Sequence, residues 1–184
     1  ERLYCIKYER TRSGARGERY YTSPTADDLR REAKVVELLG ERFSNWQDKG
    51  YIPSDSIELG DETTRLIRER GWRYWHQLFN PRQLLNSGLL MRTIDLESKS
   101  TNELVLGILG GNTTVNYNSK LSIWINGASV ETVAQTFTNQ ALNTLFNYGC
   151  RGWRSSIQSW TIDINNFSLP ASKTEVTDAR KLKE

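Results

Sequence analysis

Histidine, cysteine and proline are scarce in this sequence, and each scarcity excludes a class of site. A single histidine, His76, excludes a metal site built from several histidines and leaves a nucleophilic triad only one candidate base. Cys5 and Cys150 are too few for a disulfide scaffold, so we expect free thiols in a cytoplasmic protein. No apolar run approaches the roughly 20 residues of a membrane-spanning helix, so no membrane partner is expected.

Catalytic motifs are also missing. The glycine-rich segment Leu104–Asn112 superficially resembles a strand that leads into a nucleotide-binding turn. It has neither the Lys-Ser/Thr pair of a phosphate loop nor an acidic residue at the ribose-binding distance. We interpret its glycines as small residues that let two helices approach closely. We therefore expect no cofactor and no metal in this chain.

Aromatic and basic residues, by contrast, are plentiful. Six tryptophans and eight tyrosines among 184 residues indicate a folded domain with a real core. The formal net charge is only +3, but six arginines and one acid, Glu69, lie between Arg65 and Arg92. A second arginine-rich stretch comprises Arg10, Arg12, Arg16 and Arg19. Localised basic surface favours phosphate or another anion, although solvated helix faces produce the same pattern.

The apolar pattern predicts a mainly α (α+β) fold, namely a helical domain with a small N-terminal β-hairpin. Residues 1–24 alternate as two strands around the turn Ser13-Gly14 and form a hairpin arm. Residues 25–150 form the helical domain. Residues 151–184 form a C-terminal segment whose apolar spacing fits a helix and a strand equally well.

Cap residues and glycines place the helices. Thr25 and Asp28 resemble a capping box, which opens a helix that runs to Trp46. The apolar spacing predicts that one face of this helix is core, namely Leu29, Ala33, Val36, Leu39, Phe43 and Trp46.

The later helices are marked in the same way. Asp61 is the expected cap of a short helix that Gly71 ends, and Asn80-Pro81 opens a helix toward Leu96. Ser100 opens the next helix, whose pattern weakens at Gly110-Gly111. The apolar stripe over 130–148 predicts a final helix.

Two stretches carry a resemblance to a known family. The first runs from Arg70 to Leu85 and contains Leu78-Phe79-Asn80-Pro81-Arg82-Gln83-Leu84-Leu85. The second is Asn116-Tyr117-Asn118-Ser119-Lys120-Leu121, followed by Trp124 and by Gln135-Thr136-Phe137-Thr138-Asn139-Gln140-Ala141-Leu142. In this order they resemble the region between the two catalytic halves of adenine-specific DNA methylases that contain a zinc ribbon. The resemblance covers about residues 1–150.

The resemblance implies a fragment of a methylase and not a complete one. Such enzymes transfer a methyl group from S-adenosylmethionine to the adenine amino group, and their catalytic motif is Asp-Pro-Pro-Tyr or a close relative. Here no two prolines are adjacent, and the cofactor motif and the Cys-x-x-Cys zinc ligands are absent. The segment Val176–Leu182 resembles the strand and turn that precede the catalytic motif. S-adenosylmethionine and zinc are therefore implied for the parent enzyme only.

An insertion at this place is suited to hold the DNA substrate, because N6 methylation of duplex adenine generally requires the base to leave the stack. The expected partners are DNA and the rest of the parent methylase. The predicted DNA-binding residues are Arg73, Arg82, Lys120, Arg151 and Arg154 for phosphates, Gln83, Asn116, Asn118 and Gln140 for base edges, and Trp75 and Trp124 for stacking.

Each of these residues also has a structural interpretation, and the domain has alternative functions. Arg82 can pair with an acidic residue, and Trp72, Trp75 and Phe79 are spaced to pack as core. The alternative function is a structural scaffold or protein-interaction domain with no nucleic-acid role. A third possibility is an independent enzyme with a site that no motif reveals.

Overall fold

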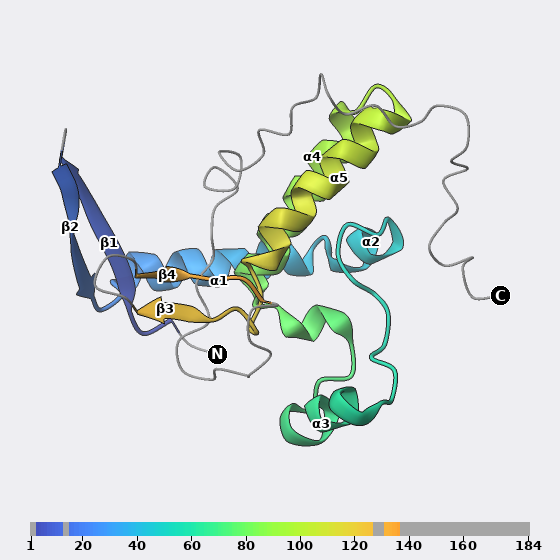
Figure 1. Ribbon diagram of the computed structural model, residues 1–184, viewed down its shortest axis with the longest axis horizontal. Helices are drawn as coiled ribbons and strands as arrows, with labels where there is room; N and C mark the ends of the chain where they lie inside the picture. Colours follow the sequence, from blue (N-terminus) through green and yellow to red (C-terminus); the bar gives the residue numbers. More distant parts are fainter. Residues whose placement is uncertain (1–2, 13–14, 127–130, 137–184) are drawn as a thin grey trace.

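The computed structural model describes residues 3–12, 15–126 and 131–136. Within these ranges the fold is mainly helical with an N-terminal hairpin, as the sequence predicts (Figure 1). The elements, in chain order, are β1 (Ile6–Arg12), β2 (Ala15–Thr22), α1 (Ala26–Gly40), α2 (Phe43–Asp48), α3 (Asp61–Arg70), the 3-10 helix η1 (Trp75–Leu78), α4 (Pro81–Glu97), α5 (Thr101–Asn116), β3 (Trp124–Asn126) and β4 (Glu131–Val133).

Helix α1 begins at the predicted capping box but is shorter than predicted. The Thr25 hydroxyl accepts the Asp28 N–H, and the Asp28 carboxylate accepts the Thr25 N–H. The single helix expected over 25–46 is two helices, because α1 ends at Gly40 and α2 begins at Phe43. The turn between them brings Trp46, which is 3% exposed, into the same core as Leu39.

The predicted core face of α1 is wrong except at Leu39. Leu29 is 37% exposed and Val36 is 56% exposed, and Ala33 is also exposed. The less exposed positions are Glu32 and Val35, one step around the helix, because that side faces α4. Periodicity predicts the spacing of a buried face, but the neighbouring helix decides its phase.

The core lies where α1, α2 and α4 meet. Its buried residues are Leu39, Trp46, Ile52 and Leu84, with Phe43, Tyr51, Phe79 and Leu85 packed around them. Gly88 of α4 lies directly against Trp46, since a Cβ at this glycine would be 2.3 Å from the indole Cε3. The tryptophan therefore requires a residue without a side chain at this place on α4.

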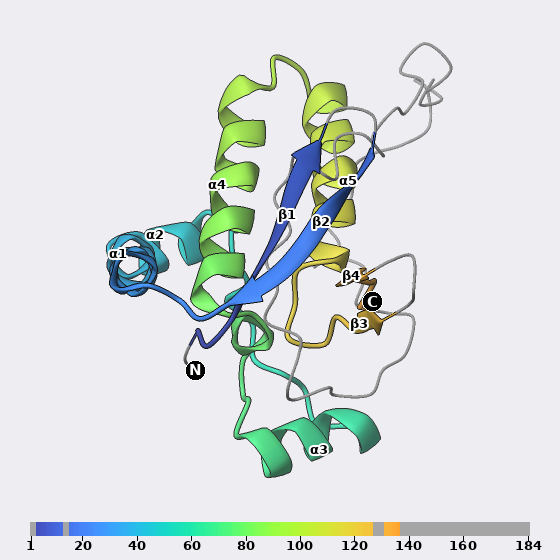
Figure 2. The same ribbon diagram turned by 90° about the vertical axis from the view of Figure 1, so that its left-hand side faces the viewer.

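Helices α4 and α5 pack side by side through the glycine-rich segment (Figures 1 and 2). A Cβ at Gly107 would be 2.5 Å from Ile94 Cγ2, and a Cβ at Gly111 would be 2.5 Å from Met91 Cε. This confirms the interpretation of the glycines as small residues for close helix approach. Helix α5 continues past them to Asn116, further than the pattern indicated.

The helix expected over 130–148 is wrong where the structure describes it. Glu131–Val133 is strand β4, which pairs antiparallel with β3 in the register Trp124–Val133, Ile125–Thr132 and Asn126–Glu131. Backbone hydrogen bonds from Ala134 to Ile123 and from Thr136 to Asn116 then hold the chain against earlier segments. These long-range bonds override the local helical spacing. The rest of that predicted helix and the segment 151–184 lie outside the described residues.

Three smaller features complete the fold. The expected cap Asp61 is instead the first residue of α3, and Gly60 is the cap. Cys5 is a half-buried free thiol. In the part of the chain that the structure describes, no helix combines the length and the apolar character needed to cross a membrane.

Candidate nucleic-acid interface

The candidate site is built on the segment from Arg70 to Trp75, which we call the strip, together with Lys120. Helix α3 leads into it and lies at the edge of the molecule (Figure 1). Gly71 ends the helix with φ 70°, the left-handed conformation that favours glycine, and its N–H donates to the Ile67 carbonyl. The helix stop thus turns the chain into the extended strip.

Backbone hydrogen bonds hold the strip on both sides. The Ile57 N–H donates to the Arg73 carbonyl at 2.8 Å, and the Trp75 N–H donates to the Asp55 carbonyl at 3.1 Å. On the other side, the Gln77 side-chain oxygen accepts the Arg73 N–H at 2.6 Å. The position of the strip therefore depends on main-chain bonds and on Gln77, and not on the outward side chains.

The outward side chains are a cation and aromatic rings. Arg73 is exposed and forms no ion pair with any residue in the described ranges. Tyr74 is 45% exposed and Trp75 is 39% exposed. An exposed guanidinium binds phosphate, and exposed aromatic rings stack on bases. Surfaces that bind single-stranded or unstacked nucleic acid combine these two kinds of group.

Lys120 connects the two stretches that resemble the methylases. Its N–H donates to the Leu78 carbonyl at 2.7 Å. Its Nζ lies 5.3 Å from the Trp72 ring centroid, within the range of a cation–π contact. Segments 42 residues apart (120 − 78) therefore meet, and Lys120 adds positive charge next to the strip.

His76 joins the strip to the core. Its ring meets Phe43 edge-on at 5.1 Å and stacks on Tyr74 at 5.4 Å. Its Nδ1 lies 3.4 Å from Gln47 Nε2. Burial lowers the pKa of His76 below its usual 6.5, a hydrogen bond to the Pro53 backbone partly opposes this shift, and the nearby Lys120 charge adds a smaller lowering effect. Folding therefore favours the neutral form of His76.

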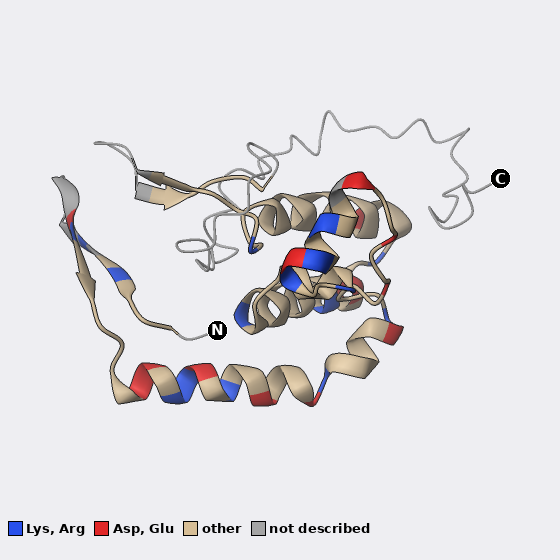
Figure 3. Ribbon diagram, turned by 90° about the horizontal axis from the view of Figure 1, so that it is seen from below, with Lys and Arg blue, Asp and Glu red and all other residues tan. Residues whose placement is uncertain are grey.

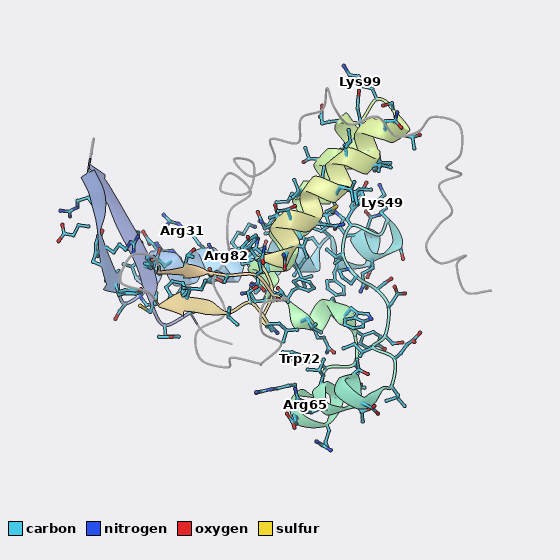
Figure 4. All side chains as sticks on the ribbon, in the orientation of Figure 1. Arg31, Lys49, Arg65, Trp72, Arg82 and Lys99 are labelled. Atoms are coloured by element: carbon cyan, nitrogen blue, oxygen red, sulfur yellow. The ribbon has the colours of Figure 1, made fainter. Side chains whose placement is uncertain are left out.

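Arginines that are neighbours in sequence are separated in space. Arg82, in the first turn of α4, pairs with Glu32 of α1, so it holds two helices together as the structural interpretation predicts. In Figure 4 it lies near Arg31 and away from Trp72 and Arg65. Figure 3 shows further basic residues on α3, next to the strip. The basic stretch therefore divides into a structural part and a surface part.

The structure removes two amides from the predicted site. Gln83 and Asn118 have no exposed surface. Gln83 forms a capping box at the start of α4, where its side chain accepts the Asn80 N–H at 2.9 Å and its N–H donates to Asn80 Oδ1 at 2.8 Å. Neither amide can reach a base edge, because both are enclosed by protein.

Asn116 and its neighbours form a buried polar cluster. The Asn116 carbonyl accepts both the N–H and the hydroxyl of Thr136, at 2.7 and 2.8 Å. The Ser119 and Ser122 hydroxyls lie 2.8 and 3.1 Å from Thr136 Oγ1. This cluster holds the chain after α5 in place. The sequence does not reveal this cluster, because serine and threonine spacing does not indicate burial.

The remaining predicted residues lie away from the strip or outside the described residues. Trp124 is half-buried on β3, where Lys7 of the hairpin has its Nζ 5.3 Å from the indole centroid. Gln140, Arg151 and Arg154 lie outside the described residues. Trp72 and Tyr74 belong to the strip but are not among the predicted site residues, because no motif in the sequence points to them.

Within the described ranges, no group of histidine, cysteine and acidic side chains is arranged to hold a metal ion. No protein-family model, curated protein or solved structure matches the chain. The resemblance to the methylases therefore depends on the two stretches alone.

Proposed function

We propose that this chain is a non-catalytic, DNA-contacting domain of an adenine-specific (N6) DNA methyltransferase, and that the strip and Lys120 are its DNA-binding surface. The observation that carries the proposal is Arg73, an exposed arginine beside Trp75 on a rigid backbone and without an ion-pair partner among the described residues. A free guanidinium binds phosphate, and exposed aromatic rings stack on unpaired bases. The methylase parent is inferred from the two resembling stretches.

The contact between those stretches supports a shared role. Lys120 from the second stretch lies over Trp72 from the first. In a parent enzyme that moves adenine out of the duplex, such a surface would hold the backbone near the displaced base. Arg82 is left out of this surface, because its guanidinium pairs with Glu32.

Binding of labelled duplex DNA, followed by fluorescence anisotropy at several salt concentrations, tests the proposal. Arg73→Gln should flatten the log–log salt slope by about 0.9, the effect of one lost phosphate contact. Arg92→Gln, an exposed arginine on α4, is the matched control and should leave the slope unchanged. Both variants should keep the wild-type melting temperature. An Arg73 variant with an unchanged slope would remove the strip from the site.

The non-catalytic part has its own test. The chain should transfer no labelled methyl group from S-adenosylmethionine to adenine-containing DNA, because the proline pair and the cofactor motif are absent from the sequence. Methyl transfer by the purified chain would refute this part of the proposal.

The alternative, a scaffold or protein-interaction domain, is favoured by a different observation. Leu29 and Val36 leave apolar surface exposed on α1, and Leu109 does so on α5. If DNA binding is absent at low salt, this alternative becomes the better account. A Val36→Lys variant should then weaken association with the rest of the parent protein.

A further inference from the structure

The N-terminal β-ribbon, made of β1 and β2, has features that its fold does not explain. It projects from the helical body (Figures 1 and 2), and among the described strands it pairs with no third strand. An isolated two-stranded ribbon is at best marginally stable in water. Its side chains should therefore make contacts, with the domain or with a partner, that stabilise it.

One face of the ribbon carries stacked tyrosines and an arginine. The register pairs Tyr8 with Tyr20, so both side chains lie on one face, and Arg10 lies two residues from Tyr8 on that face. The two rings stack with centroids 5.4 Å apart, and the Arg10 guanidinium lies 5.9 Å from the Tyr20 ring. Tyr8 is 40% exposed and Tyr20 is 42% exposed. This face is therefore flat, aromatic and open to solvent.

The opposite face makes the contact between the ribbon and β3, although its Tyr21 is 53% exposed. Lys7 and Tyr21 pair there, and Lys7 reaches Trp124 of β3. Since side chains alternate along a strand, the contact with β3 directs the Tyr8–Tyr20 face away from the β3–β4 hairpin. The open face is thus available to a partner while the other face connects the ribbon to the domain.

The charge of the ribbon matches a polyanion. Residues 3–22 contain five basic residues and two acidic ones, Glu9 and Glu18, an excess of three positive charges. The basic residues are Lys7, Arg10, Arg12, Arg16 and Arg19. Such an excess on a narrow element favours phosphate, and it disfavours pairing with a second copy of the same ribbon.

We propose that this ribbon is a second DNA contact, which enters the major groove with the face of Tyr8, Arg10 and Tyr20 toward the base edges. The groove of B-form DNA, about 12 Å wide and about 8.5 Å deep, admits a two-stranded ribbon. The major groove of A-form RNA is too narrow, so duplex DNA is the ligand. The inference rests on the proposed function for the class of ligand, but it uses a separate element.

The test uses the full chain and a short labelled duplex. Tyr8→Ala combined with Tyr20→Ala should weaken binding by about tenfold, as expected for lost base contacts. Because this double variant can unfold the ribbon, Arg10→Gln serves as a second variant that keeps both tyrosines, and it should weaken binding by about tenfold through the loss of a base contact. Arg30→Gln, at an exposed arginine paired with Asp27, is the control and should bind as wild type.

Protection of guanine N7 from dimethyl sulfate identifies the groove, because this atom lies in the major groove. The wild-type chain should protect N7, Arg10→Gln should reduce the protection, and Arg73→Gln should retain it on the DNA that is bound. Binding without N7 protection, wild-type binding by Arg10→Gln, or equally tight binding of duplex RNA would overturn the ribbon inference.

The outcomes separate this inference from the proposed function. Salt-dependent binding that responds to Arg73→Gln but not to Arg10→Gln overturns the ribbon contact and keeps the strip. The reverse pattern supports the ribbon and removes the strip. If the wild-type chain binds no DNA, both the ribbon contact and the proposed function of the strip are overturned.

Discussion

Trp46 lies in the core and Trp75 lies in the strip, and different interactions hold these two regions in place. Trp46 is 3% exposed in an apolar core, where its ring occupies the space that Gly88 leaves open. Trp75 is 39% exposed in the strip, and its place is set by a hydrogen bond from its N–H to the Asp55 carbonyl. In the core the side chains determine the packing, whereas in the strip the main chain does. The exposed side chains of Arg73 and Trp75 can therefore change without loss of the fold, which is what a binding surface requires.

The largest expected difference comes from truncating the two tryptophans. Trp46→Ala should lower the free energy of unfolding by about 3–5 kcal/mol, because it leaves a cavity in the core. Trp75→Ala should lower it by about 1 kcal/mol or less, since much of that ring already contacts water. Urea denaturation of both variants measures the difference. Equal losses would mean that the strip is packed like the core.

A smaller effect is expected at the junction between the strip and α4. Asn80→Ala removes the cap of α4 and leaves the buried Gln83 N–H without its acceptor. The loss should be about 1–2 kcal/mol in the same denaturation assay. Asn80→Asp keeps an acceptor at the cap and should retain most of the stability. If both variants melt alike, the cap does not hold this junction.

Arg82 and Arg73 allow the same comparison between a residue that joins helices and a residue that is exposed. Arg82 and Glu32 join α4 to α1, but the pair is partly exposed, with 46% and 31% of the two side chains accessible. A double-mutant cycle with Arg82→Gln and Glu32→Gln should give a coupling free energy of about 0.5 kcal/mol, weaker at high salt. Arg73→Gln should leave stability unchanged while it alters DNA binding. A stability loss at Arg73 larger than at Arg82 would reverse the roles assigned here.

The smallest effect concerns His76, which touches both regions. Its pKa in the folded chain is lower than the usual 6.5, mainly because the ring is buried, so folding favours the neutral form. The unfolded chain therefore binds more protons at acidic pH. The contribution of His76 is fully present above about pH 6.5 and is lost as the pH falls through the lowered folded value.

His76→Gln should remove this part of the pH dependence. The comparison requires melting curves of the wild type and the variant, recorded from neutral to mildly acidic pH. The difference between the two proteins should shrink as the pH is lowered. A difference that stays constant would mean that protonation of His76 is not linked to folding.

Much of the local architecture, and part of the candidate site, follows from the sequence. The caps at Thr25 and Asn80 and the stop at Gly71 were predicted, since each depends on a few adjacent residues. The close approach of α4 and α5 was also predicted, because glycine leaves space wherever it lies on a helix. Arg73, Trp75 and Lys120 were predicted as site residues, and they lie on or beside one strip.

Contacts between distant residues decided the rest. The position of α4 determines which side of α1 is covered, so Glu32 faces α4 and Val36 is exposed. Pairing with β3 makes 131–133 a strand where local spacing indicates a helix. Tertiary contacts also bury Gln83 and pair Arg82 with Glu32, while Arg73 stays exposed. Local spacing encodes the period of an element, but burial and pairing depend on what the fold places opposite each side chain.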